Sequence, residues 1–591
     1  MLYFIGIWIL LIFVCLLIGT ALLNILQASS FKRTGDRFIA AVWLGLVALS
    51  ISLLAVSLVF PLSPLVGLLL AISLIFFSLQ SSGTRTELIA LRSRLSWSLI
   101  CRFLTLELAV AAFMTQPITW IDTGLYHLGA IRWLAEYGMV PGLALIHFRF
   151  GWTSSWFALA APLNWNIFNY QTVAVTNGLA FLIFLLHFII SLTHIFTNKI
   201  RFADIFITIF NFIAFPLLIF RTLPFIKGKS IMAQILISPS PDILILLLTG
   251  VIAWTILIIS DQSYLRTGAS ENKTYLMDER VIPLFLSIGA VSMKLTAIPI
   301  LLVTSFFYLF KKPLSIQRFL ILILIIFLLL SPMLIFGVMT SGCPLSPSTF
   351  MCVNLPWSPL SLNTTALSTQ KIGVDWALLG RPSDGDNFWL WILWKWSKSS
   401  ILNLIIILLN FIAVIGVFLG LFFINKKSLL GAIWVLLIGI VGMIIIFKQA
   451  PELRYGIGYF ILIPTLIAAI FFDKIFLNIK AQVNWQKFLL APSNFLVKKY
   501  FNKPMFFVGL ATVFCIQGIA QSRLFLPPAL PTVELAKAQI NDIEYVYPSP
   551  LSALCWGSQL PCTLGPIPIN IQLRDPSKGI SAGFVYVKKE S

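Results

Sequence analysis

The sequence predicts an all-α polytopic membrane protein, and three observations support this class. Of its 591 residues, 59% are hydrophobic and only 10% are charged, and the mean hydropathy is +0.96. Many apolar runs reach the roughly 20 residues that cross a bilayer, such as 38–60, 241–260 and 401–421. The formal net charge of +20 is spread over short loops. It therefore indicates membrane topology and contact with anionic lipids, and no nucleic-acid partner is expected.

The loop charges predict an orientation for each apolar segment. The first segment, 2–26, is followed by Lys32, Arg33 and Arg37, so we expect an uncleaved anchor with its N-terminus outside. The segment 281–310 fits as two short helices that meet outside near Lys294, which gives about 14 spans in a transmembrane domain covering 1–521. Alternating sides then places most basic loops in the cytoplasm, including those that carry Arg85, Arg92, Arg94, Lys199, Arg201, Lys311, Lys312, Arg318, Lys426, Lys427 and the segment 473–503.

The cysteines agree with this topology. The long outer loops would be 115–170 and 340–400, and the tail 522–591 would also lie outside. Cys343 and Cys352 fall in one outer loop and Cys555 and Cys562 in the tail, where disulfides persist. Four cysteines allow three pairings, of which we favour the two local ones, with free thiols as the alternative. The tail, with a strand-like run at 583–587, is then expected to be a small disulfide-containing domain.

A charged and aromatic island at 120–141 contains the first candidate for chemistry, Asp122. A carboxylate directly after an apolar segment is unfavourable unless it is hydrated, paired or used. Asp122 could cap a helix over 123–137, ended by Gly138 and Pro141. Alternatively, it could act as a catalytic base.

The predicted helix over 123–137 carries further candidates. Tyr126, Trp133 and Tyr137 share one face, which is typical of a helix lying on the bilayer but could also flank a sugar or lipid. Arg132 and Glu136 form an i, i+4 pair. His127 lies within about one and a half helical turns of Asp122.

Other candidates are spread along the chain. His147 and Arg149 alternate in an extended run, and Ser154 or Ser155 could cap a surface helix beyond them. Lys294 lies between apolar stretches and should reach the surface or pair with an anion. Arg454 supplies another cation, which Glu452 could neutralise. Cations that fall outside against the positive-inside tendency hint at anion binding, although hydration in a loop is the simpler reading; they are Arg221, Lys227 and Lys229.

The sequence lacks the motifs of several enzyme classes. It contains no Walker sequence, no HExxH motif and no Cys/His set spaced for zinc. Asp384-Gly-Asp386 matches a short acidic motif of some metal-dependent sugar transferases, but its composition is more typical of a turn. We therefore expect no obligatory cofactor, with a divalent metal as a weaker alternative.

The candidate residues share the predicted outer face. A carboxylate there can take a proton from an acceptor hydroxyl, and nearby cations can stabilise a departing phosphate. Because phosphate is already a good leaving group, no second carboxylic acid is needed, unlike in glycoside hydrolysis. This combination suits the transfer of a group from a lipid phosphate.

The run Trp120-Ile-Asp-Thr-Gly-Leu-Tyr-His127 resembles the first loop of GT-C superfamily glycosyltransferases. These enzymes use a loop aspartate as a base and a polyprenyl-phosphate sugar as the donor, and the hairpin at Lys294 resembles their short paired helices. Over most of its length the chain resembles an uncharacterised family of large bacterial membrane proteins, through the stretches 122–127, 152–156, 341–348, 451–454 and 555–563. It departs from the GT-C pattern in having a single Asp122 where many members have an acidic pair, which leaves metal dependence open.

The resemblance implies a GT-C-type glycosyltransferase in the bacterial inner membrane, and the loop charges place both termini outside. It would move a sugar from a polyprenyl-phosphate donor to a cell-envelope glycan or lipid acceptor. Asp122 would be the base, Lys294 and Arg454 would bind phosphate, and the remaining candidates would shape the site: His127, Arg132, His147 and Arg149. Two alternatives are an O-antigen polymerase or ligase, in which His147 and Arg149 would matter more than Asp122, and a non-enzymatic lipid or polysaccharide translocator.

Overall fold

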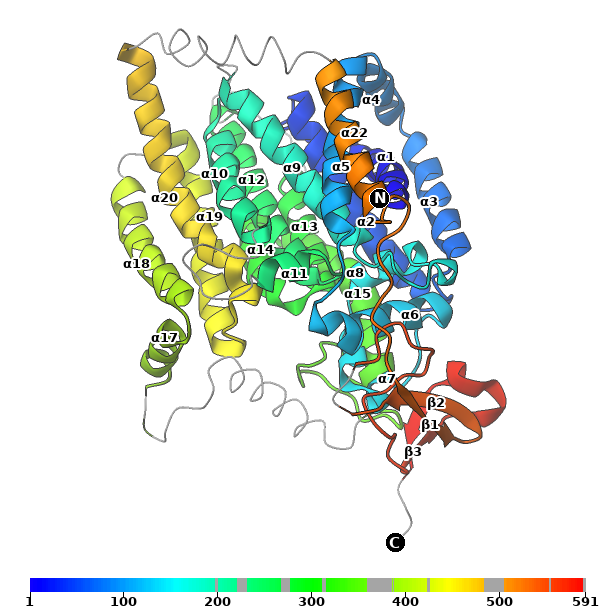
Figure 1. The fold of residues 1–591 in the computed structure, drawn as a ribbon. Helices are drawn as coiled ribbons and strands as arrows, with labels where there is room; N and C mark the ends of the chain where they lie inside the picture. The colour runs from blue at the N-terminus through cyan, green and yellow to red at the C-terminus, as the bar shows by residue number, and fades with distance from the viewer. Residues whose placement is uncertain are drawn as a thin grey trace.

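The computed structural model describes residues 1–196, 200–219, 231–266, 277–310, 315–358, 385, 387–421, 426–482, 504–551 and 554–587 (Figure 1). Some sequence predictions lie outside these described residues: Lys199, Arg221, Lys227, Lys229, Lys311, Lys312, Asp384, Asp386 and the segment 483–503.

Long apolar helices form the body of the protein, which is therefore a multi-pass membrane protein. Within the described residues, nine helices are long and apolar enough to cross a membrane, or ten if one bent pair forms a span. The predicted number of about 14 spans remains a prediction. The nine helices are α1 (Leu2–Ile25), α2 (Thr34–Ser57), α5 (Trp97–Met114), α9 (Val175–Phe196), α10 (Phe202–Ile219), α12 (Pro241–Arg266), α15 (Ile316–Ser341), α19 (Lys426–Gln449) and α20 (Leu453–Gln482).

Shorter elements complete the bundle and its loops. The remaining helices around the bundle are α3 (Pro64–Leu79), α4 (Ser82–Arg92), α11 (Ile231–Leu236), α13 (Val281–Met293), α14 (Ile298–Leu309), α17 (Phe388–Ser399), α18 (Ile401–Leu421) and α22 (Pro504–Ala520). The loop after α5 holds η1 (Thr123–His127), α6 (Leu128–Glu136), α7 (Leu143–Ile146), η2 (Phe148–Gly151), α8 (Ser155–Ala160), η3 (Ala161–Leu163) and η4 (Asn166–Phe168). The single turn η5 (Leu295–Ala297) precedes α14, and the tail holds η7 (Pro576–Ala582) and the strands β1 (Leu535–Ile540), β2 (Ile543–Pro548), β3 (Ile571–Leu573) and β4 (Phe584–Tyr586).

Two glycines allow α1 and α2 to pack with their backbones in contact. A Cβ atom at Gly19 would lie 1.7 Å from the Ala41 carbonyl oxygen, and one at Gly45 would lie 1.9 Å from the Cys15 carbonyl oxygen. Small residues at such crossings let membrane helices approach closely. Close packing is needed here because lipid provides no hydrophobic force to hold the helices together. Helix α8, which belongs to the loop after α5, packs against α2. The crossing of α1 and α2 therefore forms one side of the buried core that supports this loop.

The predicted hairpin at Lys294 is present. Helices α13 and α14 lie against each other, and the Ser287 and Thr304 hydroxyl oxygens are 2.6 Å apart across the pair. Lys294 stands at the break between them in an extended backbone conformation. The hairpin therefore delivers a lysine to the end of the bundle that carries strands β1 to β4, called here the tail end.

The tail packs on the loop after α5, with which it shares an apolar cluster. Strand β1 pairs antiparallel with β2, and β3 with β4. Phe584 of β4 donates its backbone N–H to the Pro141 carbonyl over 2.9 Å, and its ring packs against Trp133. Trp133 is only 1% exposed and also packs on Tyr137, so this part of the aromatic face is covered by the tail. The interpretation of the stripe as a face lying on the bilayer is therefore wrong for Trp133, because protein covers it.

The favoured cysteine pairings are confirmed. Cys343 pairs with Cys352, and Cys555 pairs with Cys562. The Met1 ammonium also donates hydrogen bonds to the carbonyls of Arg523 and Phe525 over 2.9 and 3.2 Å. The start of α1 and the start of the tail therefore lie together.

The prediction of a surface helix after Ser154 is wrong. All residues of α8 are buried, and the helix packs against α2, α6 and α13. The Ser154 hydroxyl donates to the Met293 carbonyl over 2.8 Å, and the Ser155 hydroxyl lies 2.8 Å from that of Ser292. Both serines thus attach the loop to the Lys294 hairpin instead of capping α8.

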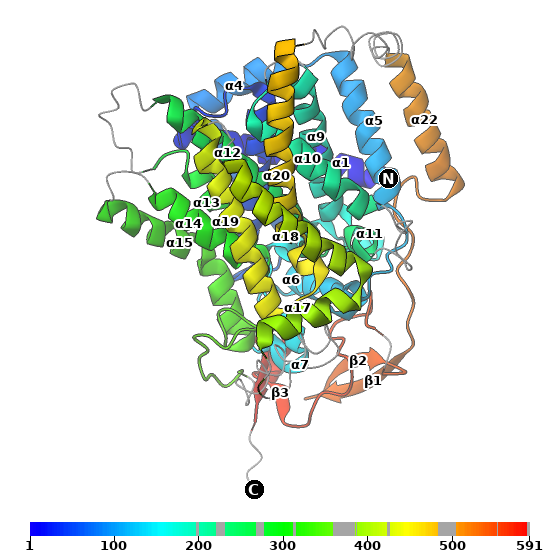
Figure 2. The same cartoon turned by 90° about the vertical axis from the view of Figure 1, so that its left-hand side faces the viewer.

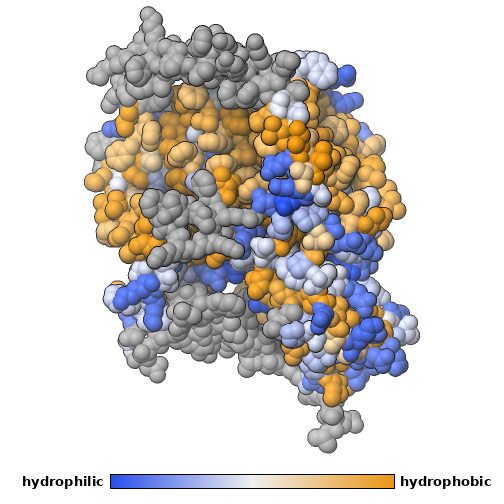
Figure 3. Space-filling model, in the orientation of Figure 1, coloured by the Kyte–Doolittle hydropathy of each residue, from blue (hydrophilic) through white to orange (hydrophobic). Residues whose placement is uncertain are grey.

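The surface of the bundle is largely apolar, as expected for contact with lipid. Figure 3 shows hydrophobic residues over much of the visible face of the bundle and many hydrophilic residues around the tail. Outward-facing side chains such as Phe77 on α3 and Phe327 on α15 are 70% and 65% exposed. In a water-soluble protein so much exposed apolar surface would mark an interaction site, and here it suits the bilayer.

Candidate functional site

Asp122 forms an ion pair with Arg454, which lies 332 residues further along the chain. The Arg454 Nη1 donates to Asp122 Oδ2 over 2.6 Å, and both side chains are largely buried. Asp122 precedes η1 and α6, so the expected helix over 123–137 is present, but its side chain makes no capping hydrogen bond. The capping interpretation of Asp122 is therefore wrong, because the carboxylate is turned toward the start of α20.

Arg454 joins three further side chains at this point. Its Nε donates to Glu452 Oε2 over 2.6 Å, which confirms the expected neutralisation, and its Nη2 donates to the Tyr455 hydroxyl over 2.7 Å. The guanidinium carbon also lies 5.2 Å from the centre of the Trp120 ring. Planar guanidinium groups suit this combination of carboxylates and aromatic rings.

Lys294 pairs with Asp242, a residue that the sequence analysis did not single out. The Lys294 ammonium contacts Asp242 Oδ1 and lies 4.1 Å from the centre of the Tyr455 ring. Tyr455 therefore touches both Arg454 and Lys294 and links the two ion pairs. A signal for Asp242 was available, because it directly precedes an apolar run, as Asp122 directly follows one.

Arg149 is the cation at this site that has no acidic partner within the described part of the chain. Its guanidinium carbon lies 4.8 Å from the ring centre of Phe148, 5.6 Å from that of Trp152 and 5.7 Å from that of Tyr126. Aromatic faces stabilise a guanidinium without neutralising it. Arg149 is therefore the side chain here whose charge is most available to an anion.

His127 lies beside these charged residues and stays neutral. Its ring is 1% exposed and packs against Tyr126 and Phe157. Burial lowers its pKa to about 3, and the net effect of nearby charges, which include the cations Lys294 and Arg149, does not restore it. His127 can therefore accept or donate a hydrogen bond at neutral pH, but it carries no charge.

Buried polar atoms without a hydrogen-bond partner gather in the same segments. Among the described residues they include Trp120 Nε1, Thr123 Oγ1, His127 Nδ1, Thr153 Oγ1 and Thr296 Oγ1. Most buried polar atoms in proteins are paired, so such a group calls for an explanation. These atoms are available to bond a polar ligand at this site.

The structure turns two predicted site residues toward the protein itself. His147 accepts the backbone N–H of Arg149 at Nδ1 over 3.2 Å and packs on Phe150. Arg132 makes the expected pair with Glu136 over 2.8 Å and donates to the carbonyls of Gly557 and Ser558 in the tail. The structure thus brings together Asp122, His127, Arg149, Lys294 and Arg454, while His147 and Arg132 hold the surrounding loop and tail.

The position of Arg132 leads to a test of its role. Arg132→Gln removes a cation that binds two tail carbonyls, so we expect the tail to become more sensitive to limited proteolysis. Glu136→Gln, which leaves the carbonyl contacts in place, is the matched control. Equal proteolysis of the wild-type protein and Arg132→Gln would contradict this role of Arg132.

The two loop histidines predict a loss of stability in acid. Their pKa values are lowered by burial from 6.5 to about 3 for His127 and about 4 for His147. Between pH 6.5 and 4 the unfolded chain binds protons that the folded protein does not, so stability falls as the pH is lowered. The melting temperature in detergent should therefore fall more steeply from pH 7 to pH 5 than that of a His127→Gln/His147→Gln variant. Equal slopes would contradict this origin.

The described residues contain no cluster of three His, Cys, Asp or Glu side chains that could hold a metal ion. Comparison of the chain with curated proteins and with solved structures finds no match. A family model described as "Domain of unknown function (DUF8201)" matches residues 1–461, a range that contains Asp122, Asp242, Lys294 and Arg454 and ends before the tail. The chain therefore belongs to the DUF8201 family.

Proposed function

We propose that this protein is a GT-C-like glycosyltransferase that moves a sugar from a polyprenyl-phosphate donor to a cell-envelope acceptor. The observation that carries the proposal is the meeting of Asp122, Arg454 and Lys294, which come from the loop after α5, α20 and the α13–α14 hairpin. A base and two cations at one end of a membrane bundle suit a donor whose phosphate lies at the membrane surface.

The proposed reaction is a single displacement at the anomeric carbon. The acceptor hydroxyl oxygen attacks that carbon and gives its proton to the Asp122 carboxylate. The bond between the anomeric carbon and the phosphate oxygen breaks, and the phosphate leaves with the bonding electrons. Arg454 and Lys294 stabilise the negative charge that grows on this phosphate. His127 remains neutral and contributes a hydrogen bond.

The ion pairs give the donor a role in preparing the base. The Asp122 Oδ2 oxygen accepts a hydrogen bond from Arg454 over 2.6 Å, so this oxygen is already occupied by the guanidinium. A donor phosphate that competes for Arg454 would release Asp122 for proton transfer. The base would then become active when the donor is bound.

The proposed location is the bacterial inner membrane, with about 14 spans and the tail end facing outward. Both termini and the disulfide-containing tail would then be extracytoplasmic. The disulfides Cys343–Cys352 and Cys555–Cys562 support this orientation, because disulfides persist in oxidising compartments.

A second candidate is an O-antigen polymerase or ligase, which would act on a lipid diphosphate. Arg149 favours it, because its guanidinium has no acidic partner within the described residues and lies among three aromatic rings. Such an enzyme would depend on Arg149 more than on Asp122. The two candidates therefore differ in the residue whose replacement should be most damaging.

Deletion of the gene and mass spectrometry of lipid-linked sugars and surface glycans would test both candidates. We expect one donor to accumulate and one glycan to disappear, and wild-type protein to restore both. If Asp122→Asn fails to restore them while Arg149→Gln succeeds, the glycosyltransferase is supported, and the reverse result supports the polymerase or ligase. Unchanged lipids and glycans in the deletion strain would contradict both enzymes and favour a non-enzymatic role.

A further inference from the structure

A pocket of about 360 Å³ lies at the opposite end of the bundle from Asp122, between the C-terminal part of α1, the start of α2 and α4. Figures 1 and 2 both show α4 at the end far from the strands of the tail. None of the residues proposed for sugar transfer lines this pocket. Its function must therefore be considered separately.

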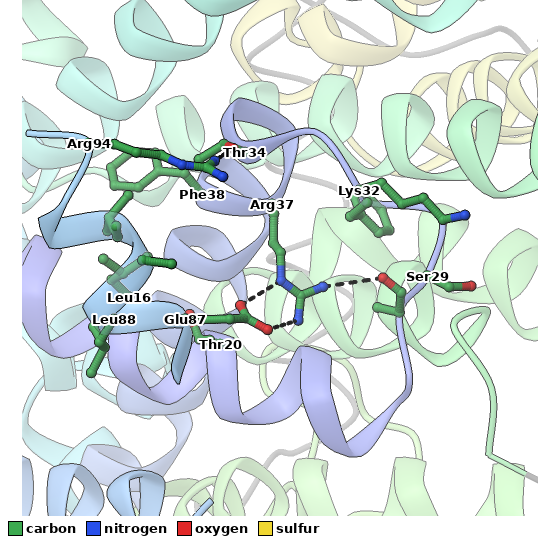
Figure 4. Close-up of a pocket in the computed structure, with 14 residues that line it drawn as sticks. Leu16, Thr20, Ser29, Lys32, Thr34, Arg37, Phe38, Glu87, Leu88 and Arg94 are labelled. Carbon is green, nitrogen blue, oxygen red and sulfur yellow. Dashed lines mark hydrogen bonds and ion pairs between the residues drawn. The ribbon is translucent and has the colours of Figure 1, made fainter. Parts of the chain in front are cut away.

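The floor of the pocket is polar but electrically balanced. Arg37 donates to both Glu87 oxygens over 2.6 and 2.7 Å and to Asn24 over 2.6 Å. Figure 4 shows Arg37 reaching Glu87, with Arg94 and Lys32 on either side. The Arg37 charge is therefore already compensated and is not the main source of positive potential.

The rim of the pocket carries two cations that are not compensated. Lys32 and Arg94 line the pocket, are exposed, and have no acidic partner within the described part of the chain. The Arg94 guanidinium donates a hydrogen bond to the Thr34 hydroxyl. The walls, in contrast, include Leu16, Leu88 and Leu91. A cationic rim over apolar walls matches a molecule with an anionic head and a hydrocarbon chain.

The position of α4 matches the membrane interface. The helix is bent by 99° from α3, so it runs across the end of the bundle instead of continuing through it. Ile89 on α4 and Trp97 at the start of α5 are 72% and 81% exposed, and exposed tryptophans are typical of the headgroup level. A pocket beneath such a helix opens where lipid phosphates lie.

We propose that this pocket binds an anionic phospholipid. The lipid headgroup lies over the rim of the pocket, where Lys32 and Arg94 stand, and part of one acyl chain packs against Leu16, Leu88 and Leu91. The site recognises the combination of a negatively charged headgroup and an apolar chain. It holds a structural lipid between α1, α2 and α4 and is independent of sugar transfer.

The test is native mass spectrometry of the full-length protein in detergent with added phosphatidylglycerol. Lys32→Gln/Arg94→Gln should weaken binding by about fivefold for each cation removed, since each contributes about 1 kcal/mol near an anionic surface. Arg85→Gln/Arg92→Gln is the matched control, because both arginines are exposed on α4 but do not line the pocket. Equal losses in the two variants would overturn the proposal in favour of diffuse attraction to the surface.

Two further measurements separate a lipid site from a phosphate site. Ala90→Trp places a bulky ring at the pocket without changing charge and should also weaken phosphatidylglycerol binding, so undiminished binding would overturn the proposal. Glycerol phosphate, which has the anion but no acyl chain, should fail to displace the lipid. Displacement at similar concentrations would show that the site takes a soluble phosphate instead.

Discussion

Replacing Asp122 with Asn is expected to lower the rate of sugar transfer by about 10²- to 10⁴-fold, the usual contribution of a general base. The amide cannot accept the proton of the acceptor hydroxyl. It can still accept the hydrogen bond from Arg454, so the local geometry should survive. The rate should be measured with purified full-length protein and the donor that accumulates in the deletion strain, and the melting temperature should be measured in parallel.

Glu452→Gln is the matched control for this experiment. Glu452 also bonds Arg454 at 2.6 Å, so both substitutions remove one negative charge from the same guanidinium. If Asp122 acts as the base, Glu452→Gln should retain most of the activity. Similar losses in the two variants would show that Asp122 only helps to hold Arg454, and full activity of Asp122→Asn would refute its catalytic role altogether.

Replacing Lys294 with Met should destabilise the protein by about 3–5 kcal/mol, the usual effect of removing one partner of a buried ion pair. The side chain of Asp242 is only 3% exposed, so loss of Lys294 leaves a buried carboxylate without its cation. Methionine keeps the approximate volume and apolar stem of lysine, which separates the loss of charge from a loss of packing. Thermal unfolding in detergent would measure the effect.

The double variant Lys294→Met/Asp242→Asn tests this explanation. Removing both charges avoids the unpaired carboxylate, so the double variant should recover much of the stability that the single variant loses. If the double variant is as unstable as Lys294→Met, the loss comes from packing around the hairpin. Transfer activity should remain low in both variants, because neither has the Lys294 cation.

Local patterns in the sequence predicted several features correctly. The charged loops at both ends of 281–310 both look cytoplasmic, which predicted a hairpin of two short helices that meet near Lys294. The i, i+4 spacing predicted the pair between Arg132 and Glu136. Short separations along the chain predicted both disulfides. Each of these features involves residues that are close in sequence.

Contacts between distant segments were predicted less well. Asp122 lies 332 residues from Arg454, and Lys294 lies 52 residues from Asp242, so no helical or strand period relates the partners. Asp122 fits the local sequence pattern of a helix cap. Its carboxylate instead pairs with Arg454, which belongs to α20. Asp242 could have been singled out because it directly precedes an apolar run. This position does not identify Lys294 as its partner.

The hydropathy and loop charges of the chain were sufficient to identify a multi-pass helical protein and to place Asp122, Lys294 and Arg454 at the same end of the bundle. They could not show that Arg454 and Lys294 are already paired with carboxylates, or that Arg149 has no acidic partner among the described residues. They also could not show that the tail covers Trp133. Hydropathy reflects the transfer of each residue into lipid, whereas ion pairing and burial depend on which distant segments the packed helices bring together.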